Sequence, residues 1–218
     1  MRTADGRVGT IRNIVWDVDG TLFDTYPAIA RAFRAGLREL GTDAPLARIV
    51  ELARESLGYC TATLAQAHHL DRALLEATVA RHYERTTPED QPPFPGVRAV
   101  CEAVRTVGGR NLIVTHRGPK GTAELLSASG LAEYFSDIIT RADEFPRKPD
   151  PAAFRAIVAR NGLRPGETLA IGDRDIDVLA ARAAGLVTCF FGPIDPGLGA
   201  DLAITDFADL APLLVADA

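Results

Sequence analysis

Two carboxylates that directly follow a run of apolar residues are the first sign of chemistry in this sequence. Asp17 and Asp19 come immediately after the apolar stretch 14–16. Ligands of open α/β sheets bind at the carboxyl ends of the strands, and two adjacent carboxylates need a cation or a shared proton to offset their repulsion. We therefore expect Asp17 to be a nucleophile, Asp19 its acid–base partner, and Mg²⁺ the cation between them.

Polar residues also end or flank three later segments. Thr115 follows the apolar run 112–114, Lys148 lies just before a predicted helix, and Asp173 follows the strand predicted at 168–171. The carboxyl ends of parallel strands lie along one edge of a sheet, so residues that are far apart in the sequence would meet there.

These residue types suit phosphoryl transfer. Asp17 can attack phosphorus and form an aspartyl-phosphate. Asp19 lies on the same side of an extended chain as Asp17, so it can protonate a leaving oxygen and then activate a water. Thr115 and a neighbouring backbone N–H can donate to the phosphoryl oxygens. Lys148 can offset the negative charge of the phosphoryl group and of Asp17.

The cation would be held by acidic side chains. Asp173, with Asp177 behind it, would complete with Asp17 an all-oxygen shell of the kind that Mg²⁺ prefers, and waters and a substrate oxygen would fill the remaining positions. Asp177 is equally well explained as an acid favoured at the start of a helix. The assignment of a metal ligand in this segment therefore rests on Asp173.

Apolar periodicity places these residues on an α/β framework. Strands are predicted at about 12–17, 111–115, 137–140, 168–171, 186–191 and 202–205, and the helices between them at about 97–107, 121–129, 151–161, 177–184 and 207–214. Strands separated by helices of this length require crossover connections. The pattern therefore predicts a mostly parallel sheet covered by helices on both faces.

The segment between residues 27 and 85 has the periodicity of successive helices and no convincing strand. Helices are predicted to begin near Pro45, Thr61 and Asp71, with Asp71 as an N-cap. Gly58 is predicted to end the helix that starts at Pro45.

The proline-dense stretch 86–96 indicates a boundary between this helical segment and the rest of the chain. We therefore predict a core made of 1–23 and 95–218, with 24–94 inserted after the first strand as a helical cap over the strand ends. Asp24 and its neighbours would be the hinge.

Composition narrows the class of protein. The chain has 218 residues, 47% of them hydrophobic, and a net charge of −5, which favours a well-buried core and argues against a nucleic-acid-binding protein. Its three cysteines have neither metal-ligand nor disulfide spacing, so we expect buried, reduced thiols. The start of the chain lacks an apolar run and no stretch is long enough to span a membrane. We expect a soluble, cytoplasmic protein.

Four motifs in this order resemble those of the haloacid dehalogenase superfamily, specifically its phosphoglycolate-phosphatase-like group with a helical C1-type cap. The matching residues are Asp17-Val18-Asp19-Gly20-Thr21-Leu22, Thr115, Lys148-Pro149, and Gly172-Asp173 followed by Asp177. The resemblance implies a Rossmann-like core, Asp17 as nucleophile and Asp19 as acid–base residue. It also implies Mg²⁺ held by the Asp17 carboxylate, the Asp19 carbonyl and Asp173. Dehalogenases of the family lack the second acid, so Asp19 points to hydrolysis of phosphate esters.

The sequence departs from this family pattern at three places. Trp16 replaces a smaller aromatic residue before the nucleophile, which we interpret as packing. The segment around Thr115 is more basic than usual, and His116 is a candidate for an additional phosphate contact. Asp175 adds an acid to the last motif and competes with Asp177 for the supporting role at the metal.

The sequence thus predicts a Mg²⁺-dependent phosphatase acting on a small phosphorylated metabolite, with phosphoglycolate as the leading substrate by resemblance. Two alternatives are a phosphosugar mutase of the same family and a non-enzymatic phospho-accepting or binding module. The module is disfavoured because all four polar motifs are retained and a helical insert would cover the site. In the insert, four residues are candidates for contacting substrate, although a solvated helix face explains each of them better: Arg48, Arg54, Tyr59 and His68.

Overall fold

The computed structural model describes residues 11–214. Residues 1–10, for which we expected no signal peptide, lie outside the described residues, as do residues 215–218. The described chain divides into two compact units, one running up to Phe23 and resuming at Pro93, the other spanning Asp24–Pro92. The function of the second unit as a cap stays a prediction.

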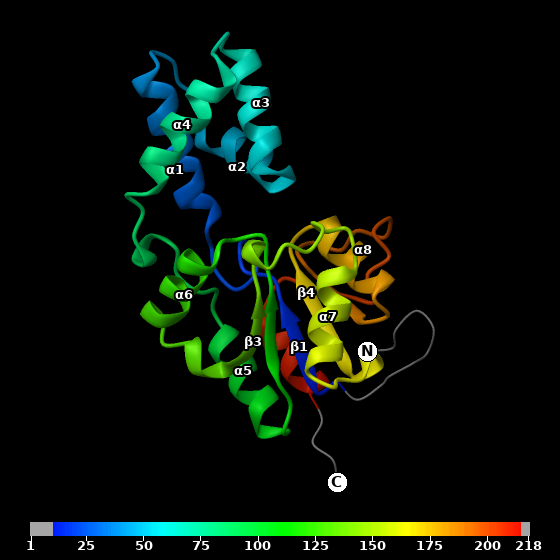
Figure 1. Cartoon of the computed structure of the whole chain (residues 1–218). Coiled ribbons are helices and arrows are strands. Elements are labelled where there is room, and N and C mark those ends of the chain that lie inside the picture. The colour runs from blue at the N-terminus through cyan, green and yellow to red at the C-terminus, as the bar shows by residue number, and fades with distance from the viewer. Residues whose placement is uncertain (1–10, 215–218) are drawn as a thin grey trace. The chain divides into compact units, whose positions relative to one another are not determined.

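The first unit is built on a six-stranded parallel sheet in the order β3-β2-β1-β4-β5-β6 (Figure 1). The strands are β1 (Asn13–Trp16), β2 (Asn111–Val114), β3 (Phe135–Ile139), β4 (Thr168–Gly172), β5 (Val187–Phe191) and β6 (Leu202–Ile204). This is the doubly wound strand order of Rossmann-like folds. Successive strands are added on one side of β1 as far as β3, and then on its other side from β4 to β6. The predicted parallel α/β core is therefore confirmed.

Helices cover both faces of the sheet. Successive side chains of a strand point to opposite faces of the sheet. In the central strand β1, Ile14 and Trp16 therefore pack in one buried cluster and Val15 packs in another. The first face is covered by α5 (Val97–Thr106) and α6 (Pro119–Ala128), the second by α7 (Ala152–Arg160) and α8 (Asp175–Ala183). The predicted three-layer arrangement is thus confirmed.

The bulky residue before the predicted nucleophile has a packing function, as expected. Trp16 is fully buried, and its ring centroid lies 5.6 Å from that of Phe207. Its indole N–H donates to Asn111 Oδ1 at 3.0 Å, and Asn111 Nδ2 donates in turn to the Cys101 carbonyl at 3.0 Å. The indole therefore links β1 to β2 and, through Asn111, to α5.

Some helices of the first unit differ from the sequence prediction in type or in where they start. The helix expected at 207–214 is a 3₁₀ helix, η5 (Phe207–Leu213), and it contains Pro212, which has no backbone N–H to donate to an α-helical ladder. Helix α8 begins two residues before Asp177. The other 3₁₀ helices are η1 (Pro88–Asp90), η2 (Ala132–Tyr134), η3 (Arg141–Asp143) and η4 (Pro165–Glu167).

The second unit consists of four α-helices around their own apolar core. They are α1 (Tyr26–Glu39), α2 (Leu46–Glu55), α3 (Leu57–Ala67) and α4 (Arg72–Tyr83). Asp71 is the N-cap of α4, as predicted, and accepts the Leu74 N–H at 2.8 Å. The prediction for Gly58 was wrong, because it lies in the first turn of α3. Ser56 starts that helix by accepting the Tyr59 N–H at 3.0 Å.

The three cysteines are free and buried, which agrees with the expectation from their spacing. Within residues 11–214, none of the helices has the length and apolar character that crossing a bilayer requires.

Candidate active site

The sheet brings the predicted residues together by hydrogen bonds that continue past the strand ends. Asp17, which follows β1, donates its N–H to the Ile171 carbonyl of β4 at 2.9 Å. Thr115, which follows β2, donates its N–H to the Ile139 carbonyl of β3 at 3.0 Å. Both backbones are thus fixed by neighbouring strands, and both side chains are buried.

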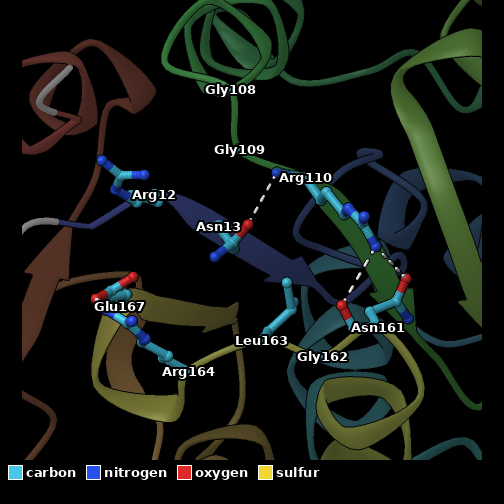
Figure 2. Close-up of a pocket in the computed structure, with 10 residues that line it drawn as sticks. All are labelled: Arg12, Asn13, Gly108, Gly109, Arg110, Asn161, Gly162, Leu163, Arg164 and Glu167. Carbon is cyan, nitrogen blue, oxygen red and sulfur yellow. Dashed lines mark hydrogen bonds and ion pairs between the residues drawn. The ribbon is translucent and has the colours of Figure 1, made fainter. Parts of the chain in front are cut away.

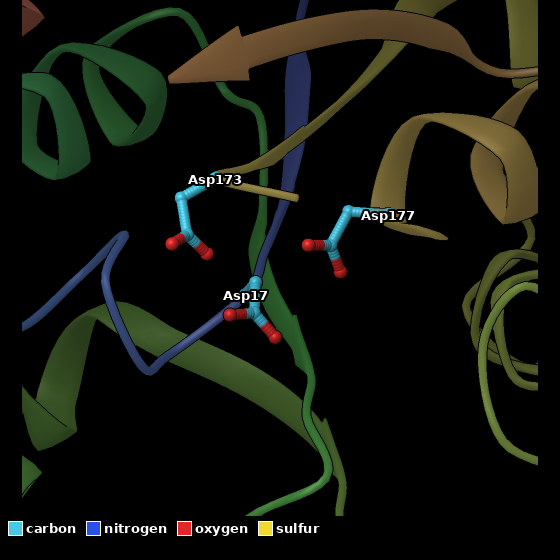
Figure 3. A group of neighbouring side chains, drawn as sticks. All are labelled: Asp17, Asp173 and Asp177. Carbon is cyan, nitrogen blue, oxygen red and sulfur yellow. The ribbon is translucent and has the colours of Figure 1, made fainter. Parts of the chain in front are cut away.

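Three buried carboxylates meet at this edge of the sheet. Asp17, Asp173 and Asp177 each offer an oxygen, and these oxygens all lie within 4.8 Å of one another. Figure 3 shows where they come from: the end of β1, the end of β4 and the start of α8. Three acids buried this closely repel strongly, so the cluster requires cations for charge balance.

Glycine at the end of β4 allows α8 to approach the strand. A Cβ added at Gly172 would lie 2.3 Å from the Cβ of Asp177 and 2.7 Å from its Oδ2. Asp177 Oδ2 also accepts the Arg174 N–H at 3.2 Å, which stabilises the first turn of the helix. The third acid is therefore held against the strand by close packing and by a cap.

Lys148 supplies a cation inside the cluster. Its Nζ lies 2.7 Å from Asp17 Oδ1 and 2.7 Å from Asp177 Oδ1, and its side chain is 1% exposed. Burial disfavours the ammonium form, but the two carboxylates outweigh burial and raise the pKa of Lys148. Lys148 is therefore charged and joins the first strand to α8.

The Asp17 carboxyl binds a proton more tightly than an ordinary aspartate does. Burial raises its pKa to about 6, and Asp177 adds to that effect while Lys148 opposes it. One of its oxygens, Oδ2, is buried and has no hydrogen-bond partner among the described residues. A buried carboxylate oxygen without a donor is costly, so this atom is suited to receive a cation.

A divalent metal fits the residues present. The donor set consists of carboxylate oxygens, which is the chemistry that Mg²⁺ selects, and the cluster contains the unpartnered Asp17 Oδ2. Of the two acids that competed for the supporting position, Asp177 lies in the cluster. Asp175 is exposed, and its Oδ1 accepts the Ile176 N–H at 2.7 Å.

His116 contacts the segment that carries Lys148. Its Nε2 accepts the Lys148 backbone N–H at 3.0 Å, so this nitrogen carries no proton. Burial, followed by the nearby charge of Lys148, lowers the pKa of His116 to about 4. The imidazole is therefore neutral near pH 7, and a phosphate contact, which stays a prediction, would have to use Nδ1.

Asp19 lies apart from the three clustered acids and is bound by Arg117. The guanidinium Nη2 lies 2.7 Å from Asp19 Oδ1. The backbone N–H of Arg117 donates to Thr115 Oγ1 at 3.1 Å, which leaves the hydroxyl hydrogen of Thr115 for another acceptor. Sequence reasoning missed Arg117 as a partner of Asp19; the unusually basic second motif was the one available signal.

Comparison with known proteins places this architecture in a family. The family of haloacid dehalogenase-like hydrolases matches residues 14–191, which include every predicted site residue. The chain belongs to this family. The family predicted from the four motifs is thus confirmed, and haloacid dehalogenase-like phosphatases use a metal ion, in keeping with the acidic cluster.

The relatives of this hydrolase include named phosphatases. It is 36% identical over 185 residues to a phosphoglycolate phosphatase of Nitrosospira multiformis, covering 80% of each chain. It is 32% identical to a phosphoglycolate phosphatase of Cupriavidus necator, covering 94% of this chain and 93% of that protein. The crystal structure of a predicted phosphoglycolate phosphatase from Haemophilus somnus 129PT shares the fold, with a TM-score of 0.84 at 20% identity and coverage of 95% and 99%.

The predicted substrate contacts of the helical unit have local partners. Arg48 pairs with Glu51 at 2.8 Å, and the Arg54 guanidinium lies 4.5 Å from the centre of the Tyr26 ring. The Nδ1 of His68 lies 2.7 Å from the hydroxyl oxygen of Thr42.

Tyr59, the fourth of these candidates, is 52% exposed. A substrate contact stays a prediction for each of the four.

A cavity of about 230 Å³ opens at the other end of the strands (Figure 2). It is lined by Asn13, Arg110 and Glu167, which lie at or before the starts of β1, β2 and β4. Its polar groups bind one another: Asn13 Oδ1 accepts the Arg110 N–H at 3.0 Å, and Arg110 Nη1 donates to the side chain of Asn161 at 3.3 Å. This cavity and the three clustered acids thus lie at opposite ends of the strands.

Proposed function

We propose that this hydrolase is a Mg²⁺-dependent phosphatase that cleaves a small organic phosphate monoester through an aspartyl-phosphate on Asp17. The family and the named relatives identify the enzyme class, a phosphoric monoester hydrolase. The names of those relatives make phosphoglycolate the leading substrate.

One observation carries the mechanism: a buried carboxylate at the end of the central strand has one oxygen on a lysine and the other unpartnered. Lys148 Nζ lies 2.7 Å from Asp17 Oδ1, and Oδ2 has no hydrogen-bond partner among residues 11–214. The lysine fixes the rotamer of the carboxylate and lowers the charge density that repels an incoming phosphate. This arrangement favours a nucleophile over a solvated acid.

In the proposed first step, an Asp17 oxygen forms a bond to phosphorus and the ester P–O bond breaks. Asp19 gives a proton to the departing alcohol oxygen. The Thr115 hydroxyl and the Lys148 ammonium donate to the phosphoryl oxygens and stabilise the charge that develops on them.

In the second step, Asp19 takes a proton from a water whose oxygen attacks phosphorus. The bond between phosphorus and Asp17 breaks, and inorganic phosphate leaves. Mg²⁺ would be held by Asp17 and Asp173, the Asp19 carbonyl and the supporting Asp177, and it would neutralise the negative charge of the bound phosphoryl group.

We further propose that the helical unit, Asp24–Pro92, acts as the cap of the predicted segment 24–94. Lids of this kind exclude water from reactive intermediates and select the substrate. The core would then supply the chemistry and the cap the choice of metabolite. The enzyme would act in the cytoplasm, without nucleic-acid or membrane partners.

The test is hydrolysis of p-nitrophenyl phosphate and of a panel of phosphometabolites that includes phosphoglycolate, with and without Mg²⁺. We expect turnover that depends on Mg²⁺ and is abolished in Asp17→Asn. A matched control is Asp209→Asn, because Asp209 is an exposed aspartate of η5 and the variant should keep full activity. No turnover of any ester with Mg²⁺, Mn²⁺ or Co²⁺ would contradict the proposal.

A further inference from the structure

An arginine two residues after Thr115 binds the predicted acid–base residue. Arg117 donates from Nη2 to Asp19 Oδ1 at 2.7 Å, and from Nε to Oδ1 at 3.1 Å and to Oδ2 at 3.3 Å. The guanidinium thus contacts both carboxylate oxygens. A planar donor that holds both oxygens fixes the orientation of the carboxylate as well as its position.

This ion pair is more enclosed than those on the surface. The side chain of Arg117 is 12% exposed and that of Asp19 is 32% exposed. In contrast, Arg31, which pairs with Asp90, is 51% exposed, and Arg164, which pairs with Glu167, is 81% exposed. Exposed pairs of long side chains hold little fixed geometry because water competes for both partners. The enclosed pair is able to define one position for Asp19.

The backbone and the side chain of Arg117 are themselves held in place. Its N–H donates to Thr115 Oγ1 at 3.1 Å, and its carbonyl accepts the Arg141 N–H at 3.2 Å. The side chain packs on the first turn of α6, where a Cβ added at Gly121 would lie 3.2 Å from Arg117 Nη1. Arg117 therefore connects Asp19 to Thr115, to Arg141 and to the first turn of α6.

We propose that Arg117 is a positioning residue that holds the Asp19 carboxylate ready to take a proton from the water that attacks the aspartyl-phosphate. The inference rests on the proposed function, in which Asp19 acts in both steps. A guanidinium has only donors, and Arg117 contacts both oxygens of the Asp19 carboxylate, so it fixes the orientation of an acceptor. Asp19 acts as the acceptor in the second step, where it takes a proton from water, and this is the step that Arg117 serves.

Arg117 is chemically unchanged by the second step, in which water attacks the aspartyl-phosphate. The water oxygen bonds to phosphorus, the bond from phosphorus to Asp17 breaks, and the water proton moves to Asp19. Arg117 stays protonated throughout and keeps one face of the carboxylate occupied. The remaining lone pairs of Asp19 are then available to the water.

The test is pre-steady-state and steady-state hydrolysis of p-nitrophenyl phosphate by the full chain with Mg²⁺. p-Nitrophenolate departs without help from an acid, so this substrate isolates the second step. In Arg117→Ala we expect kcat to fall about 10- to 100-fold. This is less than the full rate contribution of a general base, because Asp19 is still present but is no longer held in place. Because kcat/KM reports only the steps up to formation of the phospho-enzyme, it should stay unchanged. A burst of p-nitrophenolate approaching one equivalent per enzyme should appear.

Three further variants make the result specific. Arg117→Lys keeps the charge without the planar fork, so its kcat should be intermediate, and it tests the inference if the alanine variant does not fold. Lys120→Ala removes a neighbouring cation whose side chain is 91% exposed and should behave as wild type. In an Asp19→Asn background, Arg117→Ala should cause no additional loss, because the pair acts as one unit.

The inference is overturned if folded Arg117→Ala keeps its kcat. It is also overturned if kcat and kcat/KM fall together without a burst, since that pattern indicates that Arg117 binds substrate or supports the fold. These results are distinct from failure of the proposed function, which would appear as absence of turnover in the wild-type enzyme.

Discussion

An alanine at position 172 would collide with the acid that holds Lys148. The added Cβ would lie 2.3 Å from Asp177 Cβ, 2.5 Å from its Cγ and 2.7 Å from its Oδ2. Real Cβ contacts are essentially never shorter than 3.0 Å, so Asp177 or β4 must move by at least 3.0 − 2.3 = 0.7 Å. These three atoms belong to a short, buried side chain that cannot swing aside while it keeps its bond to Lys148 Nζ.

The size of the effect follows from this displacement. Overpacking of a well-packed interior costs about 1–3 kcal/mol, so the free energy of unfolding of Gly172→Ala should fall by about that amount. The shift also moves the start of α8 relative to Asp17, and misplacement of about 1 Å at a reacting centre costs about 100-fold in rate. We therefore expect kcat to fall about 10- to 100-fold.

The measurements are urea denaturation and hydrolysis of p-nitrophenyl phosphate. Gly166→Ala is the matched control, since nothing lies within 4 Å of a Cβ added there, and it should be as stable and as active as wild type. The reasoning about Gly172 is refuted if its alanine variant matches this control in both assays. Loss of stability with full activity would show that α8 can move without disturbing Asp17.

Two other predictions concern the packing beside the site. Trp16→Phe removes the donor to the buried Asn111 Oδ1, and an unsatisfied buried acceptor costs about 1–3 kcal/mol, so urea denaturation should show a loss of at least that size; an unchanged midpoint would contradict the packing role. The pKa of His116 is about 4, below its ordinary 6.5, so neutral His116 contributes stability that is complete above about pH 6.5 and is lost as the pH falls toward 4. The difference in unfolding free energy between wild type and His116→Gln should therefore shrink over that interval, and a difference independent of pH would rule this linkage out.

Local pattern was enough to predict the framework of the core. The uninterrupted apolar run Ile14, Val15 and Trp16 marks a strand buried on both faces, and such a strand requires helices on each side of the sheet. Polar residues placed directly after apolar runs, such as Asp17 and Asp173, predict one functional edge for the same reason. These signals depend on the chain's own periodicity and on the geometry of parallel strands.

Local pattern failed where two signals competed over a few residues. Gly58 resembles a helix end, but Ser56 begins a new helix by accepting the Tyr59 N–H. The segment at Phe207 has apolar periodicity, but Pro212 cannot donate to an α-helical ladder. The first case turns on a hydrogen bond that forms, and the second on a hydrogen bond that proline cannot make. Hydrophobic periodicity shows neither.

By itself, the sequence determined that acids, a threonine and a lysine would meet at one edge of a parallel sheet, because strand direction fixes which ends converge. The tertiary structure decided the pairings among them. Lys148 bridges Asp17 and Asp177, Asp175 points its carboxylate at its own helix, and Asp19 is bound by Arg117 from 98 positions away. Such pairings depend on distances of 2.7 Å between the side chains of residues from different elements. No spacing along the chain encodes them, since they arise only once the sheet has placed those elements side by side.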